Sequence, residues 1–112
     1  MLAKINRLAK QKDFDHVFKR GKSVFSANLK LRFVRNELKN SRFAFVVSNK
    51  ISKKATVRNR IRRQLSEIVR TNLTTIKKGN DVVVVVKQTI LKKDFEQITN
   101  ELLTNLKKAK LS

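Results

Sequence analysis

The chain has 112 residues and a formal net charge of +20, which results from 28 lysines and arginines against 8 aspartates and glutamates. This length predicts one domain, residues 1–112, and a hydrophobic content of 40% indicates that a folded domain carries the charge. The absence of cysteine excludes a disulfide framework and a cysteine-based zinc site. So large an excess of positive charge predicts a polyanionic partner.

A membrane is not the expected partner. The longest apolar run, Val82–Val86, is far too short to span a bilayer, and the N-terminus has no apolar region typical of a signal peptide. We therefore expect a cytoplasmic protein that binds no membrane and has no obligate protein partner.

The first expected element is a short helix over residues 13–21. Phe14, Val17 and Phe18 recur at helical spacing, and Gly21 follows two basic residues as a C-terminal stop. Phe14 and Phe18 then lie one turn apart on one face of the helix. The ordinary interpretation of such a pair is a place in the core.

Extended segments and further helices follow. Residues 24–35 are expected to be extended. Within them Leu29, Leu31 and Phe33 alternate with Lys30, Arg32 and Val34, which predicts a strand with one buried face. Residues 42–48 are apolar on both faces and predict a central strand, while Val82–Val86 predicts a strand buried on both faces. Residues 94–108 have the apolar spacing of an amphipathic helix. The expected fold is α+β, a single-domain α–β sandwich in the order α-β-β-(β)-α-β-α, with a parallel strand pair across residues 42–87.

The most distinctive stretch is Lys50–Arg70, whose only acid is Glu67. Its apolar residues recur at helical spacing over an arc of roughly 120°, as in a helix that packs on a core. Ser52 and Thr56 are the candidate N-cap residues. A polyanion-binding surface is predicted from its basic and polar side chains, which are Lys50, Lys53, Lys54, Arg58, Asn59, Arg60, Arg62, Arg63 and Arg70. The alternative is a solvated basic face.

Groups for catalysis are scarce. The chain has one histidine, no cysteine and no glycine-rich phosphate loop. Asp13, Asp15 and His16 form the only tight cluster, but these side chains point in different directions on a helix, and no strand supplies an inward-facing acid. We therefore expect a binding protein with no catalytic residue and no metal site.

RNA is the favoured polyanion. All 7 aromatic residues are phenylalanine, and phenyl rings in a groove can stack on single-stranded bases. No pattern indicates a helix-turn-helix or a heptad-based dimer. These features favour RNA and leave DNA open.

The run Ser52–Arg63, with Arg58-Asn59-Arg60 at its centre, resembles the RNR signature of the bacterial ribonuclease P protein family. The residues before it support the resemblance. Phe45-Val-Val-Ser48 is similar to the strand that precedes the basic connection of the family, and the first helix has a similar pattern, Asp13-Phe14-x-x-Val17-Phe18-x-x-Gly21. The resemblance runs from about residue 7 to residue 107. The chain departs from the family at Ser66, where many members have another basic residue. It also departs at Arg32 and Phe33, which occupy the region where many members have a Tyr or Phe.

This resemblance implies a fold like the second domain of ribosomal protein S5, with a left-handed βαβ crossover that is an exception to the usual handedness. It implies one subunit of a ribonucleoprotein endonuclease that removes the 5′ leader from precursor tRNA. The large RNA would be the catalyst and would hold most of the Mg²⁺. By the resemblance, the polyanion-binding surface binds this RNA subunit, and a cleft between the first helix and the sheet holds the leader through Phe14, Phe18 and either Arg32 or Phe33.

Three alternatives stay open. A ribosomal or general RNA-binding protein or chaperone without nuclease activity would show no preference for precursor over mature tRNA. A nucleoid-type DNA-binding protein would bind duplex DNA at least as well as structured RNA. A protein-only nuclease would cleave RNA without an RNA subunit.

Overall fold

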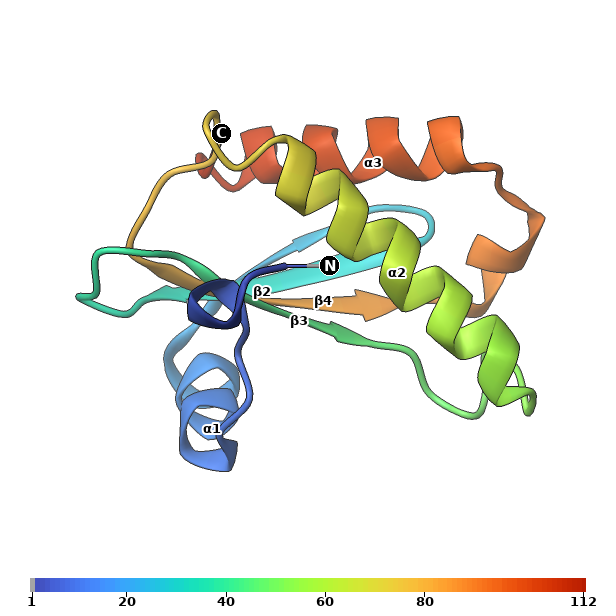
Figure 1. Cartoon of the computed structure of the whole chain (residues 1–112), viewed down its shortest axis with the longest axis horizontal. Coiled ribbons are helices and arrows are strands. Elements are labelled where there is room, and N and C mark those ends of the chain that lie inside the picture. The colour runs from blue at the N-terminus through green and yellow to red at the C-terminus, as the bar shows by residue number, and fades with distance from the viewer. Residues whose placement is uncertain (1) are drawn as a thin grey trace.

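The computed structural model describes residues 2–112, in which four strands form one sheet with α2 and α3 on one side and α1 on the other (Figure 1). The α+β class and the predicted order of helices and strands are confirmed. None of the helices in residues 2–112 combines the length and the apolar character that crossing a membrane requires. In chain order the elements are η1 (Lys4–Asn6), α1 (Gln11–Arg20), β1 (Lys22–Phe25), β2 (Leu29–Arg35), β3 (Arg42–Val46), α2 (Ala55–Thr71), β4 (Asn80–Val86), η2 (Gln88–Lys92) and α3 (Phe95–Lys108).

The sheet has the strand order β1-β2-β4-β3. β3 and β4 are parallel and the other neighbours are antiparallel, so the predicted parallel pair is confirmed. β4 is central, and Val82, Val83 and Val84 are fully buried, as their β-branched run predicted. The left-handed crossover stays a prediction.

The predicted central position of the strand at residues 42–48 is wrong, because β3 is an edge strand. Its apolar side chains pack against the main core on one face and against the α1 cluster on the other. In addition, the backbone N–H of Leu8 donates to the carbonyl oxygen of Phe43 at 2.9 Å and shields part of the open edge. Two covered faces therefore give this edge strand the composition of a central one.

The main core lies between the sheet and the helices α2 and α3. The buried face of α2 that the sequence predicted is confirmed, since Ile61, Leu65, Ile68 and Val69 are buried. The amphipathic helix predicted over residues 94–108 is also confirmed as α3, and its Leu102 is fully buried.

The N-terminus of α2 differs from the prediction. Lys54 is the N-cap residue and its side chain makes no capping hydrogen bond, while Thr56 lies inside the first turn. Ser52 Oγ accepts a hydrogen bond at 3.2 Å from the N–H of Lys54, the residue immediately before α2. The first N–H groups of α2 are thus left for water or for an approaching anion.

On the other face of the sheet, α1 packs through a small cluster that consists of Leu8, Val17 and Val83. Its N-terminal end is tied to the sheet by Arg42, whose guanidinium pairs with Asp81 at 2.7 Å and with Asp13 at 3.2 Å. The hydrogen bond to Asp81 raises the pKa of Arg42 and outweighs the effect of burial. The expectation that no strand carries an inward-facing acid is wrong, because Asp81 of β4 is buried.

Candidate nucleic-acid interface

The solvent side of α2 carries two arginines with unmatched charges. Arg60 and Arg63 are exposed, and no ion pair found in residues 2–112 involves either of them. Asn59 is also exposed, and its Oδ1 accepts a hydrogen bond from Arg62 Nη1 at 2.6 Å. The two guanidinium groups can therefore bind phosphate oxygens without breaking an ion pair within the protein.

Arg58 and Arg62 are half-buried on α2. Arg58 Nη1 donates to the carbonyl oxygen of Ser52 at 2.9 Å, and Arg62 Nη2 reaches the carbonyl oxygen of Val47 at 3.4 Å. Both arginines thus connect α2 to the segment between β3 and the helix, in addition to offering charge to a partner.

That segment forms a basic cavity of about 490 Å³, which is lined by Asn49, Lys50, Lys53 and Arg58. Lys54 is exposed at the N-cap beside it. The positive side chains and the unpaired N–H groups of the helix both favour an anion at this end of α2. The structure therefore brings the three predicted lysines together with Arg58, and their contacts with RNA stay a prediction.

Arg70 stands apart from the other predicted residues. It lies in the last turn of α2, roughly 18 Å along the helix axis from Arg58, and its Nε donates to Glu67 Oε2 at 3.0 Å. The hydrogen bonds from Arg70 lower the pKa of Glu67 below its ordinary value, and the same pair raises the pKa of Arg70. Because its charge is matched by Glu67, Arg70 is less suited to bind phosphate than Arg60 and Arg63.

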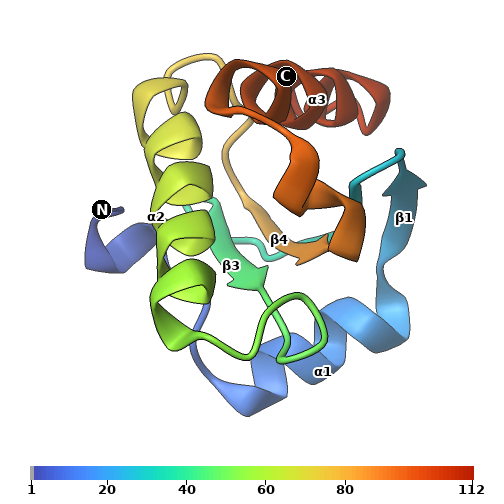
Figure 2. The same cartoon turned by 90° about the vertical axis from the view of Figure 1, so that its right-hand side faces the viewer.

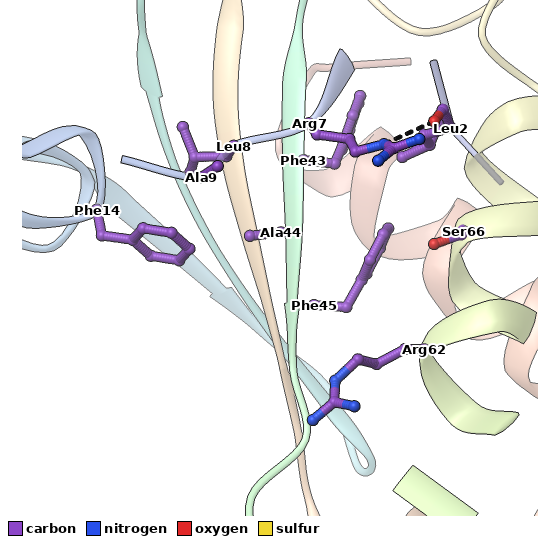
Figure 3. A pocket seen from close by; sticks show the side chains of 10 residues that line it. All are labelled: Leu2, Arg7, Leu8, Ala9, Phe14, Phe43, Ala44, Phe45, Arg62 and Ser66. Carbon is purple, nitrogen blue, oxygen red and sulfur yellow. Dashed lines mark hydrogen bonds between the residues drawn. The ribbon is translucent and has the colours of Figure 1, made fainter. Parts of the chain in front are cut away.

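A second cavity, of about 340 Å³, joins α1 to α2 around the edge of β3 (Figure 3). Phe14 is half-buried and points from α1 toward Ala44, while Arg62 reaches from α2 toward the same strand. The remaining lining is mainly apolar and includes Phe43 and Phe45. Two sets of residues that the sequence predicted separately, one for the leader and one for the RNA subunit, thus meet in one cavity.

The other predicted cleft residues divide between the two faces of the sheet. Arg32 lies on the α1 side, where its Nε donates to the carbonyl oxygen of Phe18 at 3.1 Å and its Nη1 donates to Ser23 Oγ at 2.8 Å. Phe18 is 43% exposed and is therefore not a core residue. Phe33 packs against the main core on the opposite face, because successive side chains of a strand alternate. A role for Phe33 in the cleft beside α1 is therefore wrong.

The described residues do not fit a Mg²⁺ site. No three histidines or acids among residues 2–112 come together as a metal site. Asp13 and Asp81 approach the same point, but both carboxylates bind the guanidinium of Arg42. We therefore derive no step of any reaction through a metal held by this chain.

One exposed aromatic site was not predicted from the sequence. The ring of Phe25 at the end of β1 is 58% exposed, and the Nζ atoms of Lys30 and Lys87 lie 5.3 and 5.9 Å from its centroid. The only signal in the sequence was a phenylalanine before a turn, since Lys87 is far away along the chain.

Comparison with known proteins adds an independent result. A family model described as Ribonuclease P matches residues 2–110. The ribonuclease P protein component of Syntrophomonas wolfei is 37% identical over 111 residues, which cover 99% of this chain and 92% of that protein. The solved RNase P protein from Thermotoga maritima has a TM-score of 0.84 at 36% identity and covers 91% of this chain and 96% of that one. The RNase P protein of Staphylococcus aureus gives a TM-score of 0.88 at 30% identity, over 95% of this chain and 96% of that one. The chain belongs to the ribonuclease P protein family.

Proposed function

We propose that this chain is the protein subunit of a ribonuclease P ribonucleoprotein, which removes the 5′ leader from precursor tRNA in the cytoplasm. Membership of the family supports the proposal. The observation that carries it is the cavity shared by Phe14 and Arg62, because it connects a surface suited to single-stranded RNA with a surface suited to phosphates.

In this proposal the RNA subunit binds the basic face, defined as Lys50, Lys53, Lys54, Arg58, Asn59, Arg60, Arg62 and Arg63. The unpaired guanidinium groups of Arg60 and Arg63 bind phosphates through two hydrogen bonds each. The lysines and the N-terminus of α2 hold a further phosphate in the basic cavity. The side chains bind the RNA backbone, so the surface reads the shape of the RNA more than its base sequence.

The leader of precursor tRNA lies against α1 and the sheet. Phe14 offers the edge of an apolar cavity, Phe18 offers an exposed ring, and Arg32 offers a cation beneath the C-terminal end of α1. Aromatic rings that stack on bases bind single-stranded RNA with little sequence preference. Such a surface suits a substrate class in which the tRNA body is constant and the leader sequence varies.

The protein contributes charge and substrate affinity, and the RNA subunit contributes the chemistry and holds most of the Mg²⁺. Bringing the phosphates of the RNA subunit and the substrate together is electrostatically costly, and a domain of net charge +20 lowers that cost. Added Mg²⁺ lowers the same cost. The stimulation of cleavage by the protein should therefore shrink as Mg²⁺ is raised, and a stimulation independent of Mg²⁺ would contradict this mechanism.

The experiment that tests the proposed function compares the affinity of precursor and mature tRNA for the complex of this chain with a bacterial RNase P RNA. We expect the chain to strengthen binding of precursor tRNA selectively. Phe14→Leu, which keeps the apolar volume and removes the ring, should reduce this selectivity by about fivefold or more. Equal strengthening of both tRNAs would favour a general RNA-binding protein, and tighter binding of duplex DNA would favour a nucleoid-type protein.

A further inference from the structure

One row of the sheet face beside α1 is left open. The register places Phe25 of β1, Lys30 of β2, Val85 of β4 and Val46 of β3 side by side on the face against which α1 packs. In the next row Val83 is fully buried under α1, and Val85 of the open row is half-buried beside the same cluster. Both ends of the open row (Phe25, Lys30, Val85 and Val46) are exposed, since Phe25 is 58% and Val46 is 36% exposed.

Phe25 is distinguished from other exposed apolar residues by its charged neighbours. A single exposed phenyl ring is ordinary on a protein surface. Here, however, the ammonium groups of Lys30 and Lys87 lie 5.3 and 5.9 Å from one ring centroid. The site thus combines an accessible π face with two positive charges, and a nucleotide is a ligand that supplies both a flat base and a negative phosphate.

The turn that follows Phe25 is held by hydrogen bonds. Figure 2 shows β1 running from the C-terminal end of α1 toward α3. There Glu101 of α3 accepts hydrogen bonds from the backbone N–H of Asn28 at 2.8 Å, from Asn28 Nδ2 at 2.6 Å and from Ser26 Oγ. Lys87 Nζ donates to the carbonyl oxygen of Ser26 at 2.7 Å. The backbone beside Phe25 is therefore held in place before a partner binds, which lowers the entropic cost of binding.

We propose that Phe25, Lys30 and Lys87 form a stacking site for one base of the single-stranded leader, beyond the nucleotides that lie against α1. The proposal rests on the proposed function, which supplies the leader. A base stacks on a ring more strongly than an exposed ammonium group binds to it. The nucleotide therefore displaces one ammonium group from the ring, and that group stays within reach of the adjacent phosphate.

The position of the site agrees with one continuous path for the single-stranded leader. Arg32 pairs with Ser23 across the sheet, and Phe25 follows on the same face about 7 Å farther along β1. At its other end the open row reaches Val46, from which the chain leads directly into the basic segment with Lys50. A single-stranded RNA that crosses the sheet along the open row thus meets positive charge at both ends of the row and an aromatic ring at one end.

The test uses the complex of the full chain with a bacterial RNase P RNA and a series of precursor tRNAs whose leader is lengthened one nucleotide at a time. With the unaltered protein, affinity should rise with leader length and then level off. Phe25→Leu should remove the last increment, about fivefold or more, and leave mature tRNA and the shortest leaders unchanged. Phe25→Trp should restore the increment, because an indole also stacks.

Phe95→Leu is the matched control, since it makes the same replacement at a phenyl ring that is 44% exposed at the start of α3, on the far side of the sheet. It should leave the dependence on leader length unchanged. The stacking site is refuted if Phe25→Leu also leaves it unchanged. Equal weakening of all tRNAs, together with weaker binding of the RNA subunit, would assign the base to that subunit and overturn the leader assignment. If the unaltered protein shows no dependence on leader length, the proposed function itself fails.

Discussion

The charge of Arg60 and Arg63 offers the sharpest test of the basic face. Both side chains are exposed and neither belongs to an ion pair in residues 2–112, so Arg60→Gln with Arg63→Gln removes two free cations and little else. Surface substitutions of this kind change the free energy of unfolding by less than about 0.5 kcal/mol. Any effect on RNA binding therefore reports the contacts themselves.

The expected magnitude follows from counterion release. Each guanidinium is placed to bind one phosphate, and each lost contact lowers the slope of log affinity against log salt by roughly 0.8, so the double variant should lose about 1.6. At about 0.15 M salt, taking 1 M as the point where counterion release no longer favours binding, this slope corresponds to a roughly 20-fold loss of affinity.

The assay is a salt series of equilibrium binding to a bacterial RNase P RNA. Arg70→Gln is the control, because it makes the same replacement once in the same helix, at a residue paired with Glu67. We expect the control to keep the slope of the unaltered protein. An unchanged slope in the double variant, or an equal loss in the control, would refute the assignment of the basic face and leave these arginines as a solvated surface.

Three further predictions concern contacts that stabilise the fold around the site. Arg42→Met should lower the free energy of unfolding by about 3–5 kcal/mol in chemical denaturation, because it leaves the buried Asp81 unpaired, whereas Asp13→Asn should cost less than about 1 kcal/mol. Burial works to raise the pKa of Glu101, but the hydrogen bonds from Ser26 and Asn28 outweigh it and hold the pKa below its usual value. Its stabilisation is therefore complete above about pH 4.3 and is lost as the pH falls through the lower folded pKa, so Glu101→Gln should be less stable at neutral pH by a margin that shrinks in acid. Gly21→Ala should lower the melting temperature at a cost of about 1–3 kcal/mol, since its Cβ would collide with the carbonyl oxygens of Val17 and Phe33; an unchanged melting temperature would contradict that close approach.

Periodicity in the sequence predicted the helices and their buried faces, whereas residues 24–35, predicted as one extended segment, contain the turn between β1 and β2. The spacing of Ile61, Leu65 and Ile68 predicted which side of α2 is buried, and this is confirmed. The alternation of β2 left open whether Arg32 or Phe33 faces α1, because that choice depends on which side of the sheet each helix covers. The hydrogen bond from Arg32 to the carbonyl of Phe18 decides it.

Contacts between distant residues were beyond the sequence patterns. Asp81 is buried because Arg42, 39 residues away along the chain, supplies the opposite charge. Likewise Glu101 holds Asn28 across 73 residues, and no local pattern indicates either partner. The edge position of β3 was missed for a related reason, since helices on both faces give it an apolar composition on both sides.

Our proposal predicts that this chain supports cleavage by an RNA and does not cleave RNA by itself. The most direct measurement is cleavage of a precursor tRNA at low Mg²⁺ by the protein alone, by a bacterial RNase P RNA alone and by the two together. We expect efficient removal of the 5′ leader only in the mixture. Cleavage by the protein alone would contradict the claim, and a mixture no more active than the RNA alone would reduce the chain to an RNA-binding domain without this function.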